Sequence, residues 1–164
     1  MKNKPNIVKI VLGIFTILIV TCVLFYMEHA GDNKQNQLLS KIQTIAAKNI
    51  VAIKIISGNE ENIDQLKNIK SFKISEPHQI KSIKNLLKNS DKQRVGGHNR
   101  ILYEVVLIFE DNMGYVEKYL CTAYSEYDYN RDALYISEYG IKRGFMNKPI
   151  RVPQLGKLIK KMCE

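Results

Sequence analysis

Residues 101–123, ILYEVVLIFEDNMGYVEKYLCTA, decide the fold of this 164-residue chain. Residues 101–110 combine β-branched, aliphatic and aromatic side chains, which is typical of a strand. Residues 111–114 (DNMG) form a turn sequence, so we expect residues 115–123 to return as an antiparallel partner. One face of the first strand should lie in the core, and it carries Ile101, Tyr103, Val105, Leu107 and Phe109. The other face should be half covered, and it carries Leu102, Glu104, Val106, Ile108 and Glu110.

The segments around this hairpin predict more strands and helices. Residues 51–56, 69–74 and 133–139 are predicted strands, and a helical stripe of apolar residues follows Pro77. A last helix begins near Pro153. The order predicts an α+β, two-layer domain with a mainly antiparallel sheet of about five strands. Two to three helices should cover one face of that sheet.

Residues 10–27, IVLGIFTILIVTCVLFYM, contain no charged side chain. As a helix they are about 27 Å long, which is close to the thickness of a bilayer core. We predict a single transmembrane helix over 10–27. A juxtamembrane helix over 28–48 should follow, capped by Asp32 or Asn33, and then an extracytoplasmic α+β domain over 49–164.

Positive charge before the span predicts its orientation. Lys2, Lys4 and Lys9 precede the apolar stretch, so residues 1–9 should lie in the cytoplasm and the domain outside. The chain is rich in Ile, Lys and Asn, which suggests a bacterial gene of low GC content. We therefore expect a single-pass protein of the bacterial inner membrane, with its domain in the periplasm.

Three alternatives to a retained span stay open. A cleaved signal peptide would explain the basic N-terminus, but its apolar region is usually only about 7–15 residues, and Glu28 fits poorly before a cleavage site at Ala30. A lipoprotein anchor at Cys22 is disfavoured by the bulky Thr21 and by the apolar residues that follow. A buried core helix should have a polar face, which this stretch lacks.

The net charge limits the possible partners. The chain has 25 basic and 16 acidic residues, and three of the lysines precede the span, so the external part is near +6. Acidic residues concentrate in 104–138 and basic residues in 141–164. These segments could steer a charged partner or neutralise each other. Because the domain faces outward, we expect no nucleic-acid partner.

The sequence contains no recognisable catalytic motif. Its serines lack a nucleophile elbow, and its histidines lack metal-ligand spacing. We therefore predict a non-enzymatic protein with no cofactor, metal ion or small-molecule substrate. His78, at a helix start, and His98, beside two glycines, are candidates for pH sensing, because histidine titrates between about pH 5 and 8. The alternative is a surface or capping role.

Two cysteines outside the span form a candidate disulfide. Cys121 lies on a predicted strand and Cys163 near the end of the last helix. An oxidising compartment favours a bond between them, which would fix the last helix to the sheet. The alternative is a pair of unbonded, small apolar residues. Redox catalysis is not expected without a C-x-x-C motif.

Tyrosines and acidic residues concentrate between the last two predicted strands. Tyrosine is favoured at interfaces because it gives a large contact area at low entropic cost. We therefore predict a partner-binding surface made of Tyr124, Tyr127, Asp128, Tyr129 and Asp132. The alternative is that some of these tyrosines are half-buried in the sheet.

The organisation as a whole resembles a known group of proteins. A short basic N-terminus, one span at 10–27 and an external α+β domain are similar to the ToxS-like membrane-anchored companions of transmembrane transcription activators, including the PsaF and MyfF proteins. The resemblance implies a protein that binds and stabilises a sensor-activator in virulence regulation, with its histidines and cysteines sensing pH or redox state. The alternative function is a periplasmic immunity or inhibitor protein that neutralises a toxin.

Overall fold

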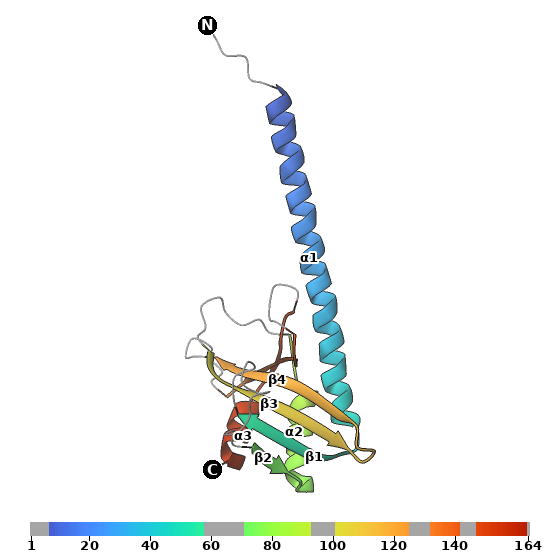
Figure 1. Ribbon diagram of the computed structural model, residues 1–164, viewed down its shortest axis with the longest axis vertical. Helices are drawn as coiled ribbons and strands as arrows, with labels where there is room; N and C mark the ends of the chain where they lie inside the picture. The colour runs from blue at the N-terminus through green and yellow to red at the C-terminus, as the bar shows by residue number, and fades with distance from the viewer. Residues whose placement is uncertain (1–6, 58–70, 93–100, 125–131, 142–146, 164) are drawn as a thin grey trace.

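The computed structural model describes residues 7–57, 71–92, 101–124, 132–141 and 147–163 (Figure 1). The elements follow in the order α1 (Ile7–Ala47), β1 (Ile50–Ser57), β2 (Ser71–Ile74), α2 (Pro77–Lys88), β3 (Ile101–Asp111), β4 (Val116–Tyr124), β5 (Leu134–Glu138), β6 (Ile150–Val152) and α3 (Leu155–Cys163). The α+β class is thus confirmed.

One antiparallel sheet forms the centre of the domain, with the strand order β2-β1-β3-β4-β5-β6. The described sheet has six strands, one more than expected. The additional strand is β6, which has only three residues and ends directly before Pro153. Its pairing with β5 is a tertiary contact, and the three residues Ile-Arg-Val are too few to predict a strand from the sequence.

The central hairpin forms as predicted. β3 pairs with β4 in a register that places Leu107 opposite Tyr119. The Asp111 carboxylate accepts hydrogen bonds from the backbone N–H groups of Met113 and Tyr115, both at 2.9 Å. Gly114 adopts a φ of 78°, a conformation that glycine reaches at little cost. Turn chemistry within five residues therefore sets the register of the longest strand pair.

The main core lies between one face of the sheet and the three helices. Val105, Leu107 and Phe109 of β3 lie in it, as predicted. Ile101 and Tyr103 from the same predicted face are 48% and 43% exposed, because they lie at the start of β3, where a register shift interrupts its pairing with β4. A smaller apolar cluster on the opposite face contains Ile56, Val106 and Leu120, with Ile108 packed against it.

The N-terminal segment forms a single helix of 41 residues. It does not begin anew at Asp32 or Asn33; both residues lie inside α1, so neither caps a separate juxtamembrane helix. The upper half of α1 projects away from the domain in Figure 1, while its lower half lies beside α2 and the sheet.

Part of α1 is long and apolar enough to cross a membrane, and it is the one such helix among the described residues. The most apolar 18-residue window of α1 is 0% buried within the protein. This excludes the alternative of a buried core helix, because a core helix would pack against the domain. The chain is therefore compatible with a single-pass membrane protein.

Candidate functional site

The second half of α1 is part of the domain core. A stripe of buried residues runs along it, consisting of Gly31, Gln35, Leu38, Ile42, Ile45 and Ala46. The apolar members from Leu38 onward belong to the same cluster as the core faces of β1, β3 and β4. The helix that provides the candidate span therefore also fills the core of the external domain.

Polar contacts attach the same half of α1 to the sheet near its β5 and β6 edge. The Gln35 side-chain amide donates a hydrogen bond to the Pro149 carbonyl at 2.8 Å, and Gln35 is only 5% exposed. Lys41 forms an ion pair with Glu138 at the end of β5. Each contact joins residues about a hundred positions apart, so the helix is fixed in rotation as well as in position.

A second polar cluster lies at the C-terminal end of α1. Lys48 pairs with Glu117 of β4, and the Tyr119 hydroxyl donates to the other Glu117 carboxylate oxygen at 2.7 Å. The hydrogen bond to Glu117 raises the pKa of Lys48, while burial and Glu117 raise the pKa of Tyr119. The Lys84 ammonium of α2 donates a hydrogen bond to the Lys48 carbonyl at 2.6 Å. A positive charge at this position is favourable, because the C-terminal end of a helix is the negative end of its dipole.

The domain begins directly below the candidate span. Met27 ends the uncharged stretch and Gly31 is the first buried residue of α1. Gly31 lies four positions after Met27 along one continuous helix, a rise of about 6 Å. If the apolar part of α1 is in a bilayer, the domain must lie against the membrane surface.

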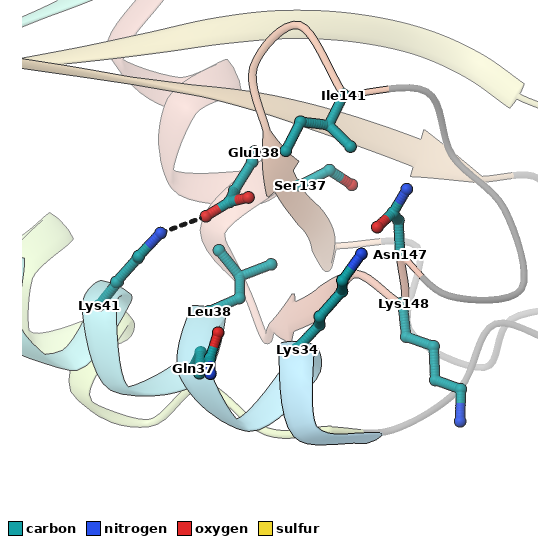
Figure 2. Close-up of a pocket in the computed structure, with 9 residues that line it drawn as sticks. All are labelled: Lys34, Gln37, Leu38, Lys41, Ser137, Glu138, Ile141, Asn147 and Lys148. Carbon is teal, nitrogen blue, oxygen red and sulfur yellow. Dashed lines mark hydrogen bonds and ion pairs between the residues drawn. The ribbon is translucent and has the colours of Figure 1, made fainter. Parts of the chain in front are cut away.

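A pocket of about 310 Å³ opens beside the docked segment of α1. Its walls come from α1, the end of β5 and the approach to β6 (Figure 2). The lining residues are Lys34, Gln37, Leu38, Lys41, Ser137, Glu138, Ile141, Asn147 and Lys148. Leu38 and Ile141 give the pocket an apolar part, and the remaining side chains are polar or charged.

The polar groups of the pocket are mainly hydrogen-bond donors. In Figure 2 the Lys34 ammonium and the Ser137 hydroxyl extend toward Asn147, whereas the Lys148 ammonium turns away. Lys148 instead pairs with Asp32 of α1. The Ser137 hydroxyl is buried and has no hydrogen-bond partner within the described parts of the chain. This arrangement of donors beside an apolar patch can bind a small anion.

The pocket was not predicted from the sequence, because its lining residues are far apart along the chain and come together only in the folded structure. Lys34, Leu38 and Lys41 do have the spacing of one helix face, which is a usable local signal. The sequence around Ser137 and Asn147 does not mark either residue as part of a site. A single serine on a strand and a single asparagine shortly before a proline are both common on protein surfaces.

One of the two predicted sensing histidines, His78, lies in the described part of the chain. His78 lies in the first turn of α2 and is largely exposed, with its Nδ1 3.4 Å from the carboxylate of Glu76. His98 lies outside the described residues. Sensing of pH by these histidines therefore stays a prediction.

The predicted disulfide also stays a prediction. Cys121 is fully buried on β4, on the face that meets the helices. Cys163 ends α3, but its side chain lies outside the described part.

The start of α3 is attached to the segment before β5 by a backbone hydrogen bond. The Gly156 N–H of α3 donates to the Asp132 carbonyl at 2.8 Å.

Most of the predicted partner-binding surface lies outside the described residues. The structure does not describe Tyr127, Asp128 and Tyr129. It describes Tyr124 only as the last residue of β4. Asp132 is described: its carboxylate is 4.0 Å from the Lys157 ammonium, in addition to the carbonyl contact with α3. Its observed contacts are therefore intramolecular.

No protein-family model, curated protein or solved structure matches this chain.

Proposed function

We propose that the protein is a non-enzymatic, membrane-anchored accessory protein of the periplasm that binds and stabilises or regulates another membrane protein. The observation that carries the proposal is that one uninterrupted helix serves as both candidate span and core element. A protein that needed only a tether could use a flexible linker, which would leave its domain free to reorient. Here the apolar part and the domain have one fixed relative orientation.

A fixed orientation suits a partner in the same membrane. Such a partner can contact the span and the domain together, because neither surface moves relative to the other. Two linked contacts raise the effective affinity without requiring either contact to be strong. The ToxS-like resemblance supports a transmembrane transcription activator as the partner. The basic N-terminus supports a cytoplasmic location for residues 1–9.

An insertion in α1 tests the proposal. Two alanines placed after His29 keep the helix intact but rotate the span by about 200° relative to the domain. We expect this full-length variant to capture much less of a single-span partner from detergent-solubilised native membranes. The matched control carries the same two alanines after Asn6, where they leave the relation between span and domain unchanged.

Both variants should show wild-type unfolding of the domain, so loss of capture cannot be attributed to misfolding. Equal capture by the two insertion variants would contradict the proposal, because the rigid connection would then be irrelevant to binding. The immunity-protein alternative predicts this equal capture, with a secreted toxin as the captured protein. The insertion pair therefore separates the two functions.

A further inference from the structure

The pocket beside Lys34 carries one cation that is not balanced by a neighbouring carboxylate. Three lysines and one glutamate line the pocket. Lys41 pairs with that glutamate, Glu138, and Lys148 pairs with Asp32. Lys34 forms no ion pair within the described residues, and in Figure 2 its ammonium extends into the pocket. An anion there would complete the local charge balance.

The Ser137 hydroxyl is the second indication of a ligand. Ser137 is 6% exposed, and its Oγ finds no hydrogen-bond partner within the described chain. Buried hydroxyls are normally paired, because an unsatisfied one loses its hydration without replacement. A ligand oxygen in the pocket could accept from Ser137 and from Lys34 together. Phosphate oxygens accept several such bonds and favour a charged donor.

The location of the pocket indicates where such a group would come from. Lys34 lies seven residues after Met27 on the same helix, a rise of about 10 Å beyond the apolar stretch. Lipid headgroups occupy about 5–7 Å of each leaflet. Side chains of a helix tilt toward its N-terminus, so the long Lys34 side chain leans toward the membrane. Ala30 and Met27 lie four and seven positions before Lys34, so they share its face of the helix, and this face leads into the apolar span.

We propose that this pocket binds a phosphodiester group, supplied by the headgroup of an anionic phospholipid whose acyl chains lie along the span. The ligand chemistry is a phosphate ester beside an apolar group, which matches the donors Lys34 and Ser137 beside the apolar side chains of Leu38 and Ile141. Binding would fix the depth of the domain at the membrane. The inference depends on the membrane location of α1 and not on the identity of any protein partner.

The test measures lipid binding to the full-length protein in a neutral detergent. Native mass spectrometry with added phosphatidylglycerol should show one tightly bound lipid, and diacylglycerol, which has the acyl chains but no phosphodiester, should bind at least about tenfold more weakly. Lys34→Gln should reduce affinity for phosphatidylglycerol by about tenfold, and Ser137→Ala by several-fold. Lys81→Gln, an equal loss of charge at an exposed position on α2, is the matched control and should leave affinity unchanged.

Soluble ligands distinguish the source of the phosphate. Glycerol 3-phosphate and inorganic phosphate are titrated into the same protein by calorimetry. Weak or absent binding of both, together with Lys34-dependent lipid binding, supports the lipid headgroup. Tight, Lys34-dependent binding of either soluble ligand supports the phosphate site but assigns it to a soluble compound, which overturns the lipid source. Equal lipid affinity of the Lys34→Gln and Lys81→Gln proteins overturns the site itself.

Discussion

Truncation of Ile42 to alanine should destabilise the external domain strongly, although Ile42 belongs to the same helix as the candidate span. Ile42 is 1% exposed and lies in the main core cluster. The substitution removes three carbon atoms, worth about 0.8 kcal/mol each, and leaves a cavity. We therefore expect a loss of about 3 to 4 kcal/mol in the free energy of unfolding, which is a large part of the stability of an ordinary domain.

The assay is urea unfolding of the full chain in a mild detergent, followed by near-ultraviolet circular dichroism of the nine tyrosines, because the chain has no tryptophan. Ile17→Ala is the matched control, since Ile17 is 67% exposed within the protein and touches no core residue. It should leave domain unfolding unchanged. A loss below about 1 kcal/mol for Ile42→Ala, or equal effects of the two substitutions, would refute the assignment of α1 to the core.

Three further changes test other contacts by the same unfolding assay. Gln35→Ala leaves the partly buried Pro149 carbonyl without its side-chain donor, so we expect a loss of about 1–2 kcal/mol; a wild-type value would mean that the contact does not hold the helix. Gly114→Ala places a side chain at a φ of 78°, and we expect a loss of about 1 kcal/mol; unchanged stability would contradict the turn geometry. The Lys48–Glu117 pair should make stability depend on alkaline pH. Because folding raises the pKa of Lys48 above its ordinary value of 10.5, the contribution of the pair is fully present below that pH and is lost as pH rises through the folded pKa. Lys48 is partly exposed, so the loss should stay below about 1 kcal/mol, and Lys48→Met should flatten this part of the profile; an identical profile in the variant would count against the pair.

Local sequence patterns predicted the elements whose determinants lie within a few residues. The β3–β4 hairpin follows from alternating strands and from a turn in which Asp111 and Gly114 provide the required contacts and φ angle. The start of α2 at Pro77 follows from the fixed φ of proline and its missing N–H. In these segments the neighbours along the chain decide the conformation.

Other features depend on contacts that the local pattern does not contain. Asp32 looked like a helix cap, but in the folded chain it pairs with Lys148, and helical residues continue through it. β6 is recognisable only through its pairing with β5. The pocket was not predictable for the same reason: Lys34 and Ser137 lie 103 positions apart in the sequence and meet only after α1 has docked on the sheet.

Hydrogen exchange across the junction between span and domain tests the central claim most directly. The full chain in lipid nanodiscs is exposed to D2O, and exchange is followed for peptides that cover Met27 to Gln35. A continuous helix predicts that the amides of residues 28–31 are protected about as well as those of the docked segment after them, because each donates to a carbonyl one turn earlier. Exchange of residues 28–31 at the rate of an unstructured peptide would show a flexible linker and contradict the account.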